Sequence, residues 1–145
     1  MSVLRIEKGF SAPPEKVFAF LTETENLLKW WGPEGMHVGE SRLDLTAPGP
    51  WWFVLVDPAG GEHKVTGEVL GIDPPNWVEF TLIVPTENGV RGIDSVVRFE
   101  VRPDGGGGTQ FSLIQTGLTD DELAAGSGKG WASTLRRLTL VLQHN

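Results

Sequence analysis

Residues 130–142 read Gly-Trp-Ala-Ser-Thr-Leu-Arg-Arg-Leu-Thr-Leu-Val-Leu. Large apolar side chains recur in this stretch at intervals of four, three and four residues: Trp131, Leu135, Leu138 and Leu142. Such spacing places them on one face of an amphipathic helix. The stretch therefore predicts a C-terminal helix with a single apolar face, which needs an apolar surface to pack against.

The segment before this stripe predicts how the helix begins. Thr119-Asp-Asp-Glu122 fits a capping box. Three glycines follow at alternate positions, Gly126, Gly128 and Gly130, and they are expected to interrupt the helix so that it starts irregularly. A phosphate-binding loop is excluded here, because Gly126-Ser-Gly-Lys-Gly130 lacks the first glycine and the final Ser or Thr of that motif.

The rest of the chain supplies strands for the helix to cover. Residues 3–10 alternate between polar and apolar side chains, with Leu4, Ile6 and Phe10 predicted to face inward. Ser11-Ala-Pro-Pro-Glu15 predicts the start of a short helix capped by Ser11, and residues 24–31 predict a second. Six further strand-like runs are separated by Gly-, Pro- and Asn-rich turns: residues 36–45, 51–57, 63–72, 77–84, 92–101 and 109–116.

These elements predict an α+β fold. A curved antiparallel sheet of about six or seven strands would wrap around the long C-terminal helix, with two short helices after the first strand. One helix does not fill the concave face of so wide a sheet, so a cavity between helix and sheet is expected unless aromatic side chains fill it. At 145 residues, the chain is expected to form a single domain, residues 1–145.

Composition excludes several classes of function. The chain has no cysteine, and its histidines lack the spacing of a zinc site, so no metal or other cofactor is expected. A formal charge of −7 argues against nucleic-acid binding. Neither a signal peptide nor a membrane-spanning stretch is evident, which predicts a cytoplasmic protein without membrane insertion.

Two polar residues stand out on the inward faces of the strands. Ser95 lies among apolar inward positions of residues 92–101, and Gln115 does so in residues 109–116. A buried polar group without a partner costs about 1–3 kcal/mol. Each must therefore bond to the other, to a helix group, to water or to a ligand. Structural pairing and ligand contact both stay open.

The order of elements and several motifs resemble the SRPBCC, or START/Bet v 1-like, superfamily, and within it the AHSA1-like family (activator of Hsp90 ATPase homologue 1-like). The motifs are Ser11-Ala-Pro-Pro-Glu-Lys-Val-Phe18, Lys29-Trp-Trp-Gly-Pro-Glu-Gly35, Pro48-Gly-Pro-Trp-Trp-Phe53, Gly67-Glu-Val-Leu-Gly-Ile-Asp-Pro-Pro75, Gly108-Thr-Gln-Phe111 and Gly130-Trp-Ala-Ser-Thr-Leu-Arg-Arg-Leu138. This resemblance implies a helix-grip fold with a hydrophobic cavity under the long helix, and ligand binding in many members.

We therefore expect the protein to bind a small hydrophobic or amphipathic molecule. The candidate cavity residues are His37, Trp51, His63, Phe80, Ser95, Val97, Phe111, Gln115, Trp131 and Leu135. Trp30 and Trp31 could also line an aromatic pocket, although core packing is the default for such residues. For His37 and His63, the alternative is a strand-end histidine that faces water.

Other functions remain as alternatives. By family analogy, the chain could be a module that interacts with a chaperone. A cyclase- or hydrolase-type enzyme would need a histidine or carboxylate inside the cavity beside Ser95 or Gln115. No catalytic residues can be assigned from the sequence. Trp51 and Trp52 point to opposite sides of their strand, so one of them could form an exposed apolar surface for a homodimer or another partner.

Overall fold

The computed structural model describes residues 2–87, 89 and 91–143, and it contains one sheet and three helices in that part of the chain. The elements are β1 (Ser2–Phe10), α1 (Pro14–Thr22), α2 (Thr24–Leu27), β2 (His37–Arg42), β3 (Gly49–Val56), β4 (Glu62–Asp73), β5 (Trp77–Val84), β6 (Ile93–Pro103), β7 (Thr109–Leu118) and α3 (Asp121–Gln143). The predicted α+β architecture, with two short helices after the first strand, is confirmed.

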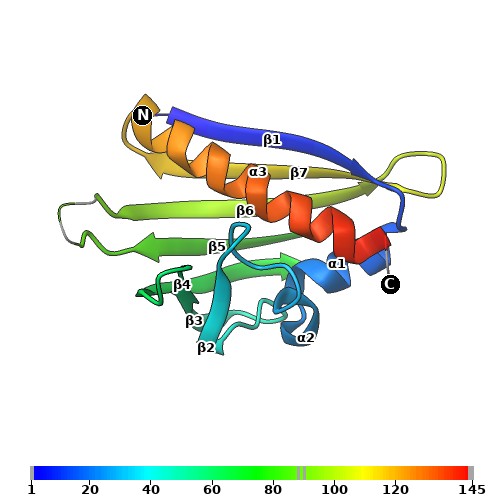
Figure 1. Cartoon of the computed structure of the whole chain (residues 1–145). Coiled ribbons are helices and arrows are strands. Elements are labelled where there is room, and N and C mark those ends of the chain that lie inside the picture. Colours follow the sequence, from blue (N-terminus) through cyan, green and yellow to red (C-terminus); the bar gives the residue numbers. More distant parts are fainter. Residues whose placement is uncertain (1, 88, 90, 144–145) are drawn as a thin grey trace.

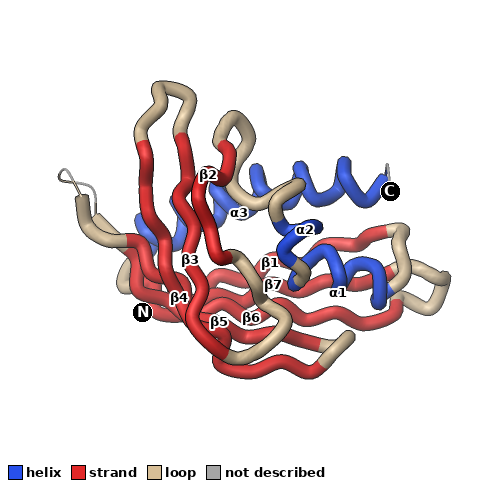
Figure 2. The backbone as a smooth tube through the Cα atoms, turned by 90° about the horizontal axis from the view of Figure 1, so that it is seen from below, coloured by secondary structure: helices blue, strands red, loops and turns tan. Residues whose placement is uncertain are grey.

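The seven strands form an antiparallel sheet in the order β1-β7-β6-β5-β4-β3-β2. β2 to β7 form a meander, and β1 pairs with β7 at the far edge. The sheet curves strongly, so that β2, β3 and β4 rise away from the plane of β1, β7 and β6 (Figure 2). α3 lies across the concave face, with α1 and α2 beside its C-terminal end (Figure 1). This is the helix-grip arrangement.

The two short helices differ in detail from their predicted form. α1 begins at Pro14 with Pro13 as its N-cap, so Ser11 does not cap it. Proline suits this place because the first helical N–H groups have no intrahelical acceptor. α2 ends at Leu27 rather than continuing to residue 31. The next three residues form turns, and Trp30 is held by a 2.8 Å hydrogen bond from its Nε1 to the carbonyl oxygen of Phe20.

α3 is one continuous helix of 23 residues, so the prediction that the glycines interrupt it is wrong. Its capping residue is Asp120 rather than Thr119, since Asp120 Oδ1 accepts a 3.0 Å hydrogen bond from the backbone N–H of Leu123. Arg91 donates to both carboxylate oxygens of Asp120, at 2.6 and 3.2 Å, and lowers the pKa of Asp120 to about 2. The predicted apolar stripe is confirmed, because Trp131, Leu135, Leu138 and Leu142 are all buried.

The glycines of α3 allow a stability prediction. Gly126 is exposed, and no atom lies within 4 Å of where its Cβ would be. Gly126→Ala is therefore expected to raise the free energy of unfolding by about 1 kcal/mol, because alanine loses less backbone entropy in a helix. Urea denaturation measures the change. Ala132→Gly, at another exposed position of α3, should lower stability by a similar amount. A loss of stability in Gly126→Ala would contradict a helix at this position.

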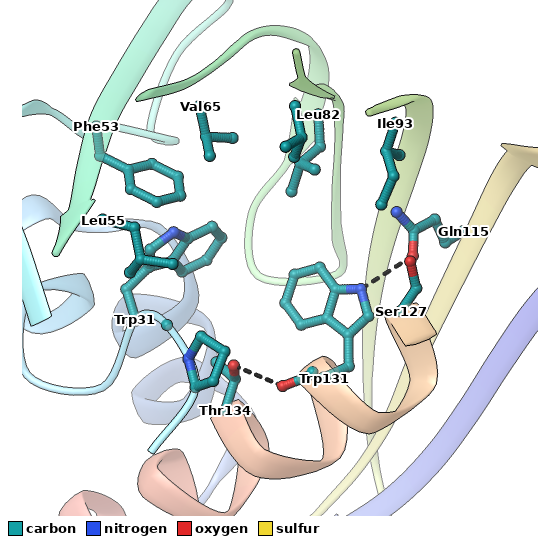
Figure 3. A pocket seen from close by; sticks show the side chains of 14 residues that line it. Trp31, Phe53, Leu55, Val65, Leu82, Ile93, Gln115, Ser127, Trp131 and Thr134 are labelled. Carbon is teal, nitrogen blue, oxygen red and sulfur yellow. Dashed lines mark hydrogen bonds between the residues drawn. The ribbon is translucent and has the colours of Figure 1, made fainter. Parts of the chain in front are cut away.

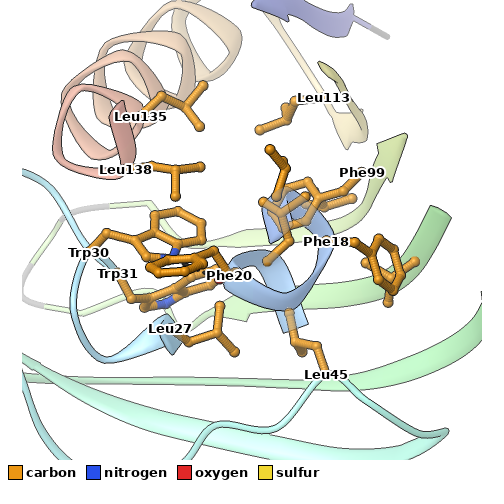
Figure 4. Packing of buried hydrophobic residues seen from close by; sticks show 14 of the residues in the cluster. Phe18, Phe20, Leu27, Trp30, Trp31, Leu45, Phe99, Leu113, Leu135 and Leu138 are labelled. Carbon is orange, nitrogen blue, oxygen red and sulfur yellow. Dashed lines mark hydrogen bonds between the residues drawn. The ribbon is translucent and has the colours of Figure 1, made fainter. Parts of the chain in front are cut away.

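The core lies between α3, the short helices and the concave face of the sheet, and it is rich in aromatic side chains (Figure 4). The inward residues predicted by alternation in β5, β6 and β7 do face this core. One residue on the outer face is an exception: strand alternation places Ser112 on the side of β7 that faces away from the core, yet Ser112 is fully buried. Its hydroxyl bonds to the Glu7 carboxylate, and Arg102 lies 3.4 Å from the same hydroxyl.

No helix in the described part of the chain is long and apolar enough to cross a membrane.

Candidate functional site

A pocket of about 240 Å³ lies between the first half of α3, the segment after α2 and the far ends of the central strands (Figure 3). The helix contributes Ser127, Gly130, Trp131 and Thr134. The sheet and the segment after α2 contribute Trp31, Gly32, Pro33, Phe53, Leu55, Val65, Leu82, Val84, Ile93 and Gln115. The strand residues come from five neighbouring strands, β3 to β7, so the curvature of the sheet forms the wall.

One side of the pocket depends on Arg137, which holds the segment at residues 31–36 against α3. Its Nη1 lies 3.0 Å from the carbonyl oxygen of Trp31, 2.9 Å from that of Gly32 and 3.3 Å from that of Met36. These carbonyl groups follow a very short helix and have few backbone donors of their own. The two N–H groups of Nη1 are shared among these three oxygen atoms and thereby fix Gly32 and Pro33 at the pocket.

A second set of bonds ties the same segment to the helix. The Ser133 hydroxyl accepts a 2.8 Å hydrogen bond from the backbone N–H of Glu34, and the Glu34 carboxylate accepts from Arg136 at 2.8 and 3.0 Å. The bond from Arg136 lowers the pKa of Glu34. These groups are exposed, so they contribute little to stability individually. Together with Arg137 they specify where the segment lies.

The aromatic part of the wall is rigid. Trp31 contacts Trp131 edge to face, with ring centroids 6.0 Å apart, and contacts Phe53 in the same way at 5.8 Å. Trp131 also packs edge to face on Phe99 at 5.8 Å. Edge-to-face geometry is the favoured arrangement of aromatic pairs. The two indoles therefore hold each other in place at the helix side of the pocket.

Two buried polar residues line the pocket, and Gln115 is the more deeply buried, with 1% of its surface exposed against 4% for Thr134. The Oε1 of Gln115 accepts a 3.0 Å hydrogen bond from Trp131 Nε1, and its Nε2 donates to Ser95 Oγ at 2.9 Å. Ser95 in turn donates to the carbonyl oxygen of Leu82 at 3.0 Å. The two polar residues singled out in the sequence thus pair with each other and with α3.

The lining is almost entirely apolar. None of its fourteen residues, all in the described part of the chain, has an ionisable side chain. The Thr134 hydroxyl donates to the carbonyl oxygen of Gly130, at 2.8 Å, within the helix. Among residues 2–87, 89 and 91–143, no three His, Asp or Glu side chains lie close enough together to hold a metal ion. The surface that these fourteen residues present to the pocket is therefore uncharged and mainly apolar.

The structure brings together only part of the predicted set of ligand contacts. Gln115 and Trp131 line the pocket. Ser95 does not line it but is hydrogen-bonded to Gln115. The other inward candidates are packed in the core and do not line the pocket: Trp51, Phe80, Val97, Phe111 and Leu135. His37 is exposed at the start of β2. His144 lies outside the described residues.

The lining residues that were not candidates share a location. Leu82, Val84 and Ile93 fall on inward positions of β5 and β6 by strand alternation, but they lie near the turn between these two strands. Phe80 and Val97 pair nearer the middle of the same two strands, where the core is closed. Strand alternation indicates which face a residue occupies but does not indicate which end of the sheet stays open.

A second hollow, of about 340 Å³, shares Leu55, Val65 and Val84 with the first and contains His63. His63 Nε2 lies 2.8 Å from Asp57 Oδ2, and its Nδ1 lies 3.9 Å from a carboxylate oxygen of Glu87. The hydrogen bond to Asp57 raises the pKa of His63, and the same bond lowers the pKa of Asp57. His63 is thus half-exposed beside the pocket rather than within it.

The ion pair of His63 and Asp57 predicts a pH dependence. A histidine whose pKa is higher in the folded than in the unfolded protein stabilises the fold at pH values below its unfolded-state pKa, which is 6.5. This contribution disappears as the pH rises through the pKa that the histidine has in the folded protein. The contribution of Asp57 is likewise lost as pH falls through its own lowered pKa, below 3.8. We expect His63→Gln to lower the melting temperature at about pH 5–6 but not at about pH 8–9. His37→Gln is the matched control, and an equal effect of His63→Gln at both pH values would contradict the ion pair.

Comparisons with known proteins agree with this architecture. The chain matches the family described as "Activator of Hsp90 ATPase homolog 1-like protein" over residues 11–143. It is similar to the AHSA1 protein of Silicibacter pomeroyi, with 38% identity over 98% of both chains and a TM-score of 0.89. A protein of Chromobacterium violaceum has the same fold at 24% identity, with 97% of this chain and 96% of that chain covered and a TM-score of 0.84. No match was found among curated proteins. The motifs, the helix-grip architecture and the match across nearly the whole chain show that this protein belongs to the AHSA1-like family of the SRPBCC superfamily.

Proposed function

We propose that the protein binds a small apolar or amphipathic molecule in the pocket beneath the first half of α3. The observation that supports this most directly is the lining, in which apolar side chains surround a single buried carboxamide, that of Gln115. Pockets of this composition, with few convergent polar groups, are typical of small-molecule sites.

The volume limits the size of the ligand. A dry apolar cavity of about 150 Å³ accommodates benzene. At about 240 Å³, this pocket would hold a molecule somewhat larger than benzene, such as a substituted benzene. The adjoining hollow beside His63 offers room for a polar extension of an amphipathic ligand.

Ligand-observed NMR with a panel of uncharged alkylbenzenes and aryl ketones tests the proposal. Binding by the wild-type protein should be lost or strongly weakened in Gly130→Leu, because Gly130 lines the pocket and its missing Cβ would point into open space. Gly126→Leu is the matched control, since it changes another helical glycine that does not line this pocket. Absence of binding across the panel, or equal binding by both variants, would contradict the proposal.

The enzyme alternative requires a proton donor or acceptor within reach of a bound molecule. His63 and Glu87 are candidates of this kind, and they border the second hollow rather than the pocket itself. Chaperone interaction, the other alternative, rests on the family name alone. Ligand binding is therefore the function that the described residues favour.

A further inference from the structure

The side-chain amide of Gln115 has one possible orientation. The carbonyl group of Leu82 can only accept, so the Ser95 hydroxyl must donate to it. Ser95 then accepts from Gln115, which requires the amide nitrogen Nε2 at that position. At the other end, the indole N–H of Trp131 can only donate, which requires the amide oxygen Oε1. Both ends of the chain of bonds thus impose the same orientation.

This orientation leaves part of the amide free. A carboxamide has two N–H donors, and only one is used, in the bond to Ser95. Among the described residues no further acceptor lies within bonding distance of Nε2. Gln115 lines the pocket, and in Figure 3 its amide nitrogen lies beside Ile93, another lining residue. A buried donor without a partner is costly, and a ligand atom that accepts from it would remove that cost.

The remainder of the lining determines what kind of acceptor is suitable. No cationic side chain is among the fourteen lining residues, all of them described, so a carboxylate confined to this pocket would have no charge partner in the lining. Burying an unpaired charge is much more costly than burying a neutral carbonyl oxygen. Ser127, on the helix near Gln115, adds only a neutral hydroxyl group.

We infer, on the basis of the proposed function, that Gln115 selects an uncharged apolar ligand with one hydrogen-bond-accepting oxygen, such as a ketone, aldehyde or ester. Such a ligand would bind more tightly than either a hydrocarbon or a carboxylate of similar size. Trp131 and Ser95 act as positioning residues, because their hydrogen bonds fix which end of the amide carries the nitrogen and leave its second N–H for the ligand oxygen. The ligand bond would be the third bond made by this amide.

Three probes of similar size separate the possibilities: acetophenone, cumene and benzoate. Their affinities are measured by calorimetry for the wild-type protein, Gln115→Met and Thr134→Val. Methionine keeps the length of Gln115 without its donor. Thr134→Val is the matched control because it removes a lining hydroxyl that is already bonded within the helix. Unfolding curves of each variant verify that it is folded under the conditions used.

We expect Gln115→Met to weaken acetophenone binding about three- to tenfold while changing cumene binding less than about twofold. Thr134→Val should leave the ratio of the two affinities unchanged, and benzoate should bind the wild-type protein at least about tenfold more weakly than acetophenone. Equal weakening of acetophenone and cumene, or benzoate binding as tight as acetophenone binding, would overturn the inference while leaving the proposed function intact. Failure of both neutral probes to bind the wild-type protein would count against the proposed function itself, and the inference would fall with it.

A measurement on the wild-type protein covers the case in which Gln115→Met does not fold. The side-chain NH₂ resonances of Gln115 in a ¹⁵N-labelled sample should shift downfield at one proton on addition of acetophenone. Cumene should leave that proton near its original position. The same shift with both probes, or with neither although both bind, would overturn the inference.

Discussion

Trp131→Ala is expected to lower the free energy of unfolding by about 3–5 kcal/mol, the usual cost of truncating a large aromatic residue in a core. The indole is 8% exposed and packs edge to face on both Trp31 and Phe99. Its removal also leaves Gln115 Oε1 without the donor that orients it. Chemical denaturation monitored by far-UV circular dichroism measures the change.

Trp52→Ala provides the matched control for Trp131→Ala. Trp52 is half-buried on the opposite side of β3 from Trp51, and the Lys64 ammonium group lies 4.8 Å from its ring centroid. Its truncation should cost less than half as much, because less apolar surface becomes exposed to water. Similar losses at both positions would mean that α3 is not anchored through Trp131.

Gly67→Ala is the second substitution for which we expect a large effect. A Cβ at this position in β4 would lie 2.5 Å from Cε2 of Trp51 and closer still to the carbonyl oxygen of Thr81. Trp51 cannot retreat easily, because it is 1% exposed, stacks on Phe53 and packs edge to face on Phe80. We expect a loss of more than about 3 kcal/mol, or failure to fold at 37 °C.

A strand glycine without this crowding is the control for Gly67→Ala. At Gly9 in β1, an added Cβ would meet only the carbonyl oxygen of Thr109, at 3.9 Å, which is an ordinary contact. Gly9→Ala should be neutral or slightly stabilising, because alanine loses less backbone entropy on folding. If Gly67→Ala were tolerated as well as Gly9→Ala, the indole of Trp51 would have to lie elsewhere. Its Nε1 has no hydrogen-bond partner among the described residues, so the indole is held by packing alone.

The sequence predicted the features that follow from local periodicity. The stripe of α3 and the inward faces of β5 to β7 repeat at the helical and strand periods, so burial could be inferred residue by residue. Strand periodicity also showed that Ser95 and Gln115 are polar residues at positions that face the apolar core. The prediction that the glycines interrupt α3 was wrong because glycine lowers the stability of a helix without preventing it. The packing of the apolar face of α3 compensates for three glycine residues.

The position of the pocket could not be predicted in this way. It depends on Arg137 reaching the carbonyl groups of Trp31 and Gly32, which lie more than a hundred residues earlier in the chain. Arg136 and Arg137 are neighbours on the same helix, and the sequence does not indicate which of them will face this segment. The burial of Ser112 has a similar origin, because its partner Glu7 is 105 residues away.

The place of β1 in the sheet has a consequence for how the chain acquires its structure during synthesis. The first strand made pairs with β7, the last strand to emerge, and with no other strand of the described sheet. Until β7 and then α3 have left the ribosome, β1 has no neighbour and the apolar face of the growing meander has no cover. Long-range pairing of this kind slows folding and prolongs exposure of strand edges. Nascent chains stalled before residue 118 should therefore stay protease-sensitive, and protection should appear only once α3 is outside the exit tunnel.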